Sequence, residues 1–334
     1  MRNIAPFILL IFFVLTSGCA TDADPKIETS DTVEATVSLS VNDFISSDGT
    51  RASTPGNSDE MRILNALVFQ FDANTGELLK NSDELLQPED ADGANNFKVG
   101  FINDKESIIA IIANIHDVEW IYENYSQRQI KEEFKRYDTF LEVSLPTERV
   151  GYLQSTGIHT TGIPMFGVSK KITITNKAFV MVPMERLFAR VDVTVDFNAV
   201  SAVGNKFNIT NLVYRNIPGY CRLKSLAESD DKQGSYPEGI DWKTYDAEGV
   251  SSFSLFMPGN LQGKVLGMTS KQNADPYPIP EHALAIDLTV QYEKDGSTKT
   301  HTYSVYPGLD EINDFNVKRN RIYDVNIKLT KLPE

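Results

Sequence analysis

Cysteine is almost absent from this sequence. Its 334 residues include only Cys19 and Cys221, which excludes a small secreted fold stapled by several disulfides. If Cys19 carries another group, Cys221 has no partner within the chain, and stability must come from apolar burial and strand pairing. The alternative is a Cys19–Cys221 disulfide, which would join a residue near the N-terminus to one in the middle of the chain.

Positive charge is also scarce. Lys and Arg total 32 against 46 Asp and Glu, so the formal net charge is −14 and the pI is near 4.8. Proteins that bind nucleic acid need a basic surface to contact the phosphates. We therefore expect no nucleic-acid partner. The hydrophobic content of 41% is high enough for packed cores.

Motifs that carry catalytic chemistry are missing as well. The sequence contains no Gly-x-Ser-x-Gly elbow and no phosphate-binding glycine loop. Cys221 has no histidine nearby in the sequence, which is typical of a structural cysteine rather than a nucleophile. We expect neither an enzyme nor a metal or other cofactor, because the four histidines show no metal-ligand spacing: His116, His159, His282 and His301.

Long hydrophobic runs are absent apart from Ile4–Leu15. This run is shorter than the roughly 20 residues of a membrane-spanning helix, and it has the length of a secretory signal. The following Thr16-Ser17-Gly18-Cys19 resembles a bacterial lipobox, with Thr16 in place of the usual leucine. We predict a signal peptide over residues 1–18, cleavage before Cys19, and a diacylglycerol on its thiol. The alternative is an ordinary secretory signal with an accidental cysteine.

Period-two alternation dominates the rest of the chain. It is clearest over Val33–Val41 and over Arg321–Leu332. Helical spacing occurs only within 117–142, which we expect to be a connection packed on a sheet. Many short strands with few helices indicate β-sandwiches, and the length suits two in tandem with a boundary near Phe197. Further strand patterns cover 63–71, 97–115, 172–175, 191–197, 209–214, 252–257, 286–292 and 300–306.

A loop follows the first alternating segment. Residues 45–59 are rich in Ser, Gly, Pro and Asp, and Arg51 is their only basic residue. A trypsin-like protease can cut such a loop, and the cut would free the first strand and expose unpaired backbone groups. A strand from another molecule could fill this groove, and head-to-tail repetition would give a fibre. The alternatives are an uncut Arg51 and a last strand paired within its own domain.

Several stretches resemble the fimbrillin family, the subunits of protease-assembled type V pili. Together with the lipobox they span nearly the whole chain in the order expected of that family. They are 49–52 (GTRA), 66–72 (ALVFQFD), 163–167 (IPMFG), 185–193 (ERLFARVDV), 256–263 (FMPGNLQG) and 314–323 (DFNVKRNRIY).

The resemblance implies an all-β fold with two tandem transthyretin-like β-sandwich domains and one short helical connection. We place these domains at 52–197 and 198–334, after a lipidated propeptide, 19–51, that contains a removable first strand. The resemblance also implies a lipid, including palmitate, that anchors Cys19 in the outer membrane.

Assembly is also implied by the resemblance. An Arg-specific surface protease would cut the Arg51–Ala52 bond, and a C-terminal donor strand would then enter the neighbouring subunit. The implied partners are further copies of the chain and other pilin subunits, such as an anchor and a tip. The donor-strand anchors would be Tyr323, Val325, Ile327 and Leu329.

We therefore predict a structural subunit of a cell-surface fimbria that supports adhesion. Two alternatives stay open. One is a pilus anchor that keeps its lipid and is never cut. The other is a glycan-binding surface lipoprotein, which would need an exposed aromatic platform. Trp242, in a loop rich in Gly, Pro and Tyr, could contribute to such a platform, whereas Trp120 lies far from it in the sequence.

Overall fold

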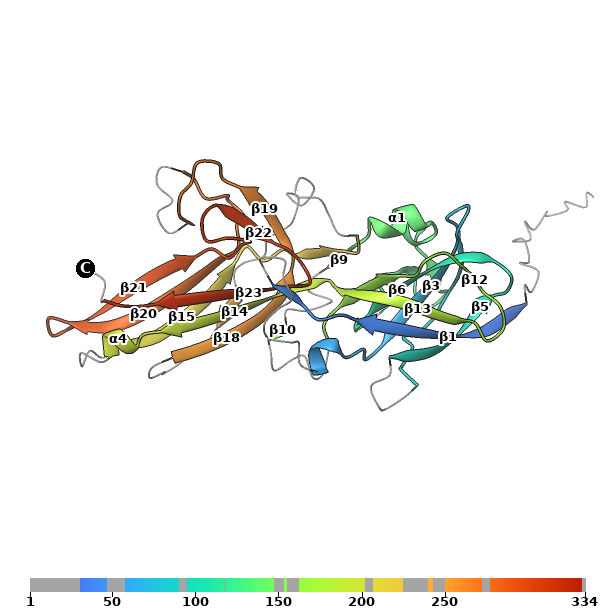
Figure 1. The fold of residues 1–334 in the computed structure, drawn as a ribbon, viewed down its shortest axis with the longest axis horizontal. Helices are drawn as coiled ribbons and strands as arrows, with labels where there is room; N and C mark the ends of the chain where they lie inside the picture. Colours follow the sequence, from blue (N-terminus) through green and yellow to red (C-terminus); the bar gives the residue numbers. More distant parts are fainter. Residues whose placement is uncertain are drawn as a thin grey trace, which may run out of the picture.

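Strands form two groups along the long axis of an elongated molecule (Figure 1). In the ranges that the structure describes, no helix is long and apolar enough to cross a bilayer, and no three His, Cys, Asp or Glu side chains cluster as metal ligands would. This computed structural model describes residues 31–46, 58–89, 95–116, 118–146, 153–154, 162–201, 207–224, 240–242, 250–271 and 277–331.

The first group is a single eight-stranded sheet. Its order is β4-β3-β6-β11-β13-β1-β5, and β12 pairs with β6. The apolar β6 is buried almost throughout, whereas β1 and β13 bury alternate residues. The strands are β1 (Thr32–Val41), β3 (Ala66–Asp72), β4 (Leu78–Asn81), β5 (Asn96–Ile102), β6 (Glu106–Ala113), β11 (Met165–Val168), β12 (Ile172–Thr173) and β13 (Phe179–Arg186).

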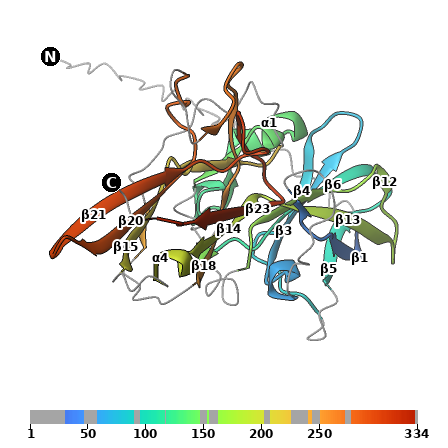
Figure 2. The same ribbon diagram turned by 60° about the vertical axis from the view of Figure 1, so that its left-hand side comes forward.

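The second group contains two sheets, which Figure 2 shows as two layers. Their orders are β10-β18-β14-β23-β2 and β17-β15-β20-β21, and their inward side chains form one shared core. Asp295 and Gly296 close the β20–β21 hairpin with positive φ. The strands are β2 (Ile45–Ser46), β10 (Leu153–Gln154), β14 (Phe188–Asp196), β15 (Phe207–Arg215), β17 (Ile240–Trp242), β18 (Val250–Pro258), β20 (Ala285–Lys294), β21 (Ser297–Val305) and β23 (Arg321–Lys328).

Smaller elements lie beside these sheets. They include two strand pairs, β9–β16 and β19–β22, and two short helical segments, η1 and α4. Their bounds are η1 (Ser58–Met61), β9 (Ser144–Pro146), α4 (Asn198–Ser201), β16 (Tyr220–Arg222), β19 (Asn260–Lys264) and β22 (Asp314–Val317).

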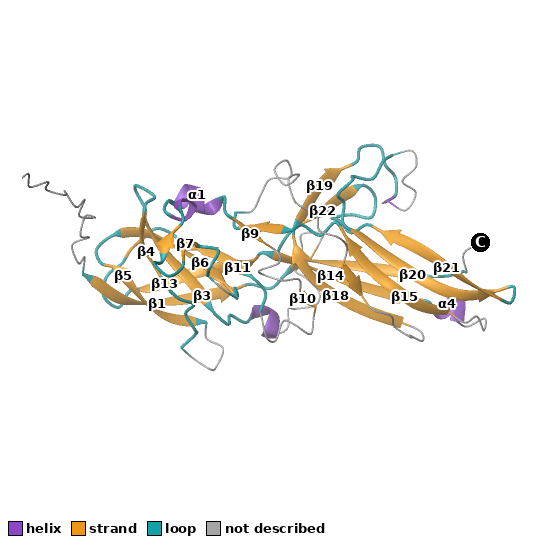
Figure 3. Cartoon of the chain, turned by 180° about the vertical axis from the view of Figure 1, so that it is seen from behind, coloured by secondary structure: helices purple, strands orange, loops and turns teal. Residues whose placement is uncertain are grey.

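The helical pattern within 117–142 is mostly not a helix. A β7–β8 hairpin comes first, with Arg128 at φ 51, and a left-handed residue of this kind interrupts an α-helix. The segment still packs on the sheet as predicted, through the buried Phe134 and Phe140. Figure 3 shows the one short α-helix here, α1. The elements are β7 (Tyr122–Asn124), β8 (Gln129–Ile130), η2 (Glu132–Phe134) and α1 (Tyr137–Leu141).

Two hydrophobic cores meet where β13 ends and β14 begins. Phe188 belongs to the N-terminal core and Ala189 to the C-terminal core. Only Leu187 separates the two strands, so an almost continuous strand path runs through both groups. The all-β prediction is confirmed. The boundary expected near Phe197 falls after β14, and because β14 pairs within the second group we propose Leu187 as the domain limit instead.

Candidate assembly site: the first and last strands

β1 is an inner strand of the N-terminal sheet. It pairs in parallel with β13 through Thr36–Val41 and antiparallel with β5 through Thr32–Ser38. Its inward side chains, Ala35, Val37 and Leu39, are at most 4% exposed. Removal of β1 would leave the facing backbone groups of β13 and β5 unpaired and would open the hydrophobic core to solvent.

The same segment also reaches the C-terminal sheet. After β1 the chain passes through Asn42–Phe44 into β2, which lies at the sheet edge beside β23. The N–H of Ile45 donates to the carbonyl of Asn320 at 3.1 Å, and β2 runs parallel to the start of β23. The N-terminal segment is therefore an inner strand in one sheet and an edge strand in the other.

β23 is paired within its own domain. It runs parallel to β14, from Ile322 opposite Arg190 to Lys328 opposite Asp196. The hydroxyl of Tyr323 accepts the N–H of Lys318 at 2.6 Å, and burial raises the pKa of this tyrosine. All four predicted donor-strand anchors are buried in the C-terminal core, between 2% and 8% exposed: Tyr323, Val325, Ile327 and Leu329.

The first and last strands follow one path along the molecule. β1 lies beside β13 and β23 lies beside β14, both in parallel, and β13 and β14 are almost continuous. The end of β1 and the start of β23 meet at Arg186, the last residue of β13. Both strands run along the long axis of the molecule (Figure 1).

Arg186 is a fully buried charge at this meeting point. Its Nη1 donates to the carbonyl of Asn42 at 2.7 Å and to Oδ1 of Asn320 at 3.2 Å, and its Nε donates to the carbonyl of Glu60 at 3.1 Å. The guanidinium carbon lies 4.1 Å from the centre of the Phe44 ring. Burial lowers the pKa of Arg186 to about 10, although nearby Glu60 acts in the opposite direction.

Three predicted site residues, Cys19, Arg51 and Ala52, lie outside the described residues. The described chain stops at Ser46 and resumes at Ser58, so the predicted cleavage bond lies between β2 and η1. Cys221 is buried, and burial raises the pKa of its thiol to about 12, as expected of a structural cysteine.

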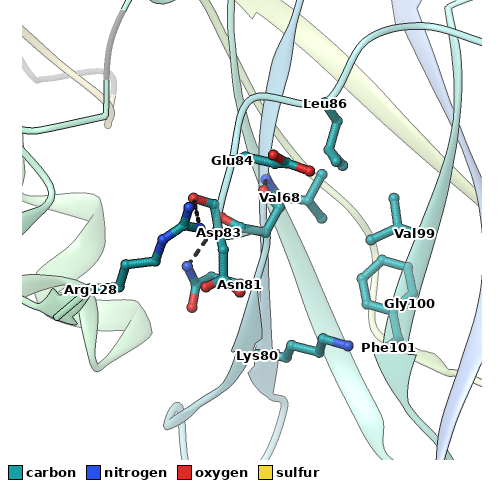
Figure 4. A pocket seen from close by; sticks show the side chains of 11 residues that line it. Val68, Lys80, Asn81, Asp83, Glu84, Leu86, Val99, Gly100, Phe101 and Arg128 are labelled. Atoms are coloured by element: carbon teal, nitrogen blue, oxygen red, sulfur yellow. Dashed lines mark hydrogen bonds between the residues drawn. The ribbon is translucent and has the colours of Figure 1, made fainter. Parts of the chain in front are cut away.

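A pocket of about 330 Å³ lies between β4 and β5, the two edges of the N-terminal sheet (Figure 4). Lys80 extends across it towards Gly100, and Arg128 donates to the carbonyl of Asp83 at 2.7 Å. Basic, acidic and apolar side chains line the pocket together, so the lining does not select one class of ligand. The lining side chains include Val68, Lys80, Asp83, Glu84, Leu86, Val99, Phe101 and Arg128.

The family profile of the major fimbrial subunit protein (FimA) matches residues 35–210, just over half of the chain. The chain belongs to this family. Its members are structural proteins of the cell surface and not enzymes, so the predicted resemblance and the predicted absence of enzymatic activity are confirmed. A second profile, a domain of unknown function (DUF4906), matches residues 255–327 and includes most of β23.

Solved structures share the fold at low sequence identity. The tip fimbrial protein Mfa3 from Porphyromonas gingivalis, solved with a C-terminal truncation, has a TM-score of 0.53 at 16% identity, covering 91% of this chain and 96% of that one. A candidate cell adhesion protein from Bacteroides eggerthii also reaches 0.53, at 12% identity over 90% and 87%. One from Parabacteroides distasonis reaches 0.53 at 14% identity over 90% and 88%. No curated protein matches the sequence.

Proposed function

We propose that this fimbrial protein is a pilus subunit, made as an outer-membrane lipoprotein precursor through Cys19. A surface protease cuts it after Arg51, it polymerises by strand exchange, and the polymer supports adhesion. The observation that carries the proposal is the place of β1, an inner strand followed by the segment that holds Arg51. One cut there would separate β1 and β2 from the rest of the chain.

Loss of β1 gives a strong reason to accept another strand. Each large apolar side chain gains about 1.5–3 kcal/mol on burial, and the ladder hydrogen bonds add to this. The vacated groove would be bounded by β13 on one side and β5 on the other. A strand that alternates apolar and polar residues would cover the core on one face and meet solvent on the other.

β23 is the proposed donor, because its alternation matches that of β1. Since β23 is already buried beside β14, exchange replaces one buried strand by another, and the net gain is smaller than the burial alone. Assembly should therefore expose the β14 edge that β23 vacates. Amides of β14 that face β23 should exchange hydrogen faster in the polymer than in the precursor.

Brief trypsin treatment of the precursor from Cys19 onward tests the cut. We expect one dominant new N-terminus at Ala52, followed by ladders that resist SDS. Arg51→Ala is the matched control, and Arg62, exposed next to the buried Ile63, is the competing site that N-terminal sequencing would recognise. A cut at Arg51 that leaves a stable monomer would contradict strand exchange and would favour an anchor or a glycan-binding lipoprotein.

A cut subunit that lacks residues 322–334 tests the direction of assembly. Such a subunit has lost β1 and can accept a strand, yet it has no β23 to donate. When it is mixed with cut wild-type protein, it should join only one end of each polymer and shorten the ladders in proportion to its amount. Unchanged ladder lengths would show that β23 is not the donated strand.

A further inference from the structure

The segment Asn42–Ser46 contacts the start of β23 in several ways. Its backbone pairs with Asn320 and with the first residues of β23. The Phe44 side chain is 1% exposed, its ring centre lies 6.2 Å from that of Phe256, and it shares a core cluster with Ile322. The third contact passes through Arg186, which bonds to Asn42 and Asn320 at once.

We propose that Asn42–Ser46 is a latch that holds β23 against β14 in the uncut precursor, with Arg186 as the residue that positions it. The inference rests on the proposed function, since it explains how one cut near the N-terminus frees a strand at the C-terminus. β1 has no part in the latch, because it pairs with β13 and β5 in the other sheet.

Loss of the latch changes the surroundings of Arg186. The guanidinium keeps the carbonyl of Glu60 and the side chain of Asn320, but it loses the carbonyl of Asn42 and the aromatic ring of Phe44. A buried charge that loses an acceptor is strongly unfavourable. Movement of Arg186 towards water relieves this cost and withdraws its hydrogen bond from Asn320.

Asn320 is a weak point in the hold on β23. Its φ of 58° lies in the left-handed region, which favours glycine. In the precursor it is held on three sides, by the N–H of Ile45, by Arg186, and through its own N–H by the carbonyl of Phe188. After the cut the first of these is gone and the second is weakened, while β23 becomes the edge strand of its sheet. The strand is then free to leave from its N-terminal end.

Ile45→Pro in the uncut precursor tests the latch directly. Proline removes the N–H that bonds to Asn320, and the Ile45 side chain is already 38% exposed. We expect the amides of Ile322–Lys328 to exchange roughly three to ten times faster, the effect of one lost hydrogen bond. Ile45→Ala keeps the N–H and should leave that exchange unchanged. Amides of β20 serve as the internal reference, and unchanged β23 exchange in Ile45→Pro would overturn the latch.

Two substitutions at Asn320 give a second test, because they should change the hydrogen-exchange rate of β23 in opposite directions. Asn320→Gly relieves the positive φ but removes the acceptor of Arg186, so β23 should exchange faster even though the backbone is less strained. Asn320→Asp keeps the acceptor and adds a charge opposite Arg186, so β23 should exchange more slowly. Equal β23 exchange in the two variants would exclude a positioning role for Arg186.

These measurements need no protease, which separates the latch from the proposed function. If trypsin does not cut at Arg51 while Ile45→Pro loosens β23, the assembly mechanism fails and the latch stands. If the cut gives SDS-resistant ladders while Ile45→Pro leaves β23 unchanged, strand exchange stands and the latch is wrong.

Discussion

The side-chain amide of Gln70 pairs with the backbone of Ile102 as a neighbouring strand would. Its Oε1 accepts the N–H of Ile102 at 2.8 Å, and its Nε2 donates to the carbonyl of Ile102 at 3.0 Å. Gln70 lies on β3 and is 1% exposed, whereas Ile102 ends β5. Among the described residues no ladder joins β3 to β5, so this side chain links the two strands directly, in addition to the ladder that β5 forms with β1.

Replacement of Gln70 by Leu should destabilise the precursor. Both backbone groups of Ile102 lose their side-chain partner, and each such loss costs about 1–3 kcal/mol. We expect a decrease of about 2–6 kcal/mol in the free energy of unfolding, measured by urea denaturation. Ser107→Ala is the control, because it removes the other bond of Gln70, 2.9 Å long, together with the bond from the Ser107 hydroxyl to the carbonyl of Lys105, and keeps the pairing with Ile102. An equal loss in both variants would contradict a special role for that pairing.

Leu39 should matter before the cut and not afterwards. Its side chain is 4% exposed in the N-terminal core, and Leu→Ala substitutions at such sites cost about 2–5 kcal/mol. Leu39→Ala should therefore lower the unfolding free energy of the precursor by about that amount. The exposed Ser40→Ala is the control. Polymers made from cut Leu39→Ala protein should match wild type in thermal denaturation, since the residue has left with β1. A less stable polymer would show that β1 stays.

Asp324 lies directly opposite Asp192 in the parallel pairing of β23 with β14. Burial raises the pKa of Asp324, the Asp192 charge raises it further, and Arg190 opposes both. The folded protein thus binds a proton at Asp324 more tightly than the unfolded chain does. This stabilisation is complete below the usual pKa of 3.8 and is lost as the pH rises through the higher folded-state pKa.

Asp324→Asn should consequently stabilise the precursor at pH 7. Like charges directly opposite across strands are unfavourable by about 0.2–1 kcal/mol, and the amide removes one of them. The advantage in urea denaturation should disappear near pH 3, where the wild-type carboxyl is protonated. Because β23 is then held more firmly in its own domain, strand exchange should also be slower. A stabilisation that is the same at both pH values would exclude the charge as its cause.

Cys221 should resist thiol reagents in the folded precursor. Burial raises the pKa of its thiol to about 12, so the reactive thiolate is scarce at pH 8, and the side chain is 5% exposed. In a Cys19→Ala precursor we expect a disulfide reagent to react only after denaturation with urea. Rapid labelling of the folded protein would place Cys221 at an open site. Labelling of the denatured wild-type chain without reductant would also exclude the Cys19–Cys221 disulfide.

Strands were predictable from the sequence where one face is buried and the alternation is complete. The expected 33–41 and 209–214 correspond to β1 and β15. The same reasoning predicted a helical segment over 117–142, because its apolar spacing fits a helix, whereas long-range packing selects a hairpin and one short helix there. β2 is too short to give a periodic signal and was missed.

The junction could not be predicted because its contacts join distant residues. Arg186 donates hydrogen bonds to groups 144 and 134 residues away in the chain. Its neighbours in the sequence indicate only a charged residue at the end of a strand. Gln70 likewise reads as an ordinary polar residue within β3. The cleavage and lipidation sites stay predictions from motifs. The alternation of the last strand indicated its buried face correctly, but it could not tell which domain that face would cover.

The common path of β1 and β23 along the long axis has a mechanical consequence. A strand held between two neighbouring strands and pulled along its own length loads all its ladder hydrogen bonds at once, in shear, whereas a strand pulled sideways loses them one after another. A neighbour's strand seated in the place of β1 would take axial tension in the first way. Drag from flowing liquid would pull such a filament along its length, which is the direction in which the contact between two subunits resists rupture best.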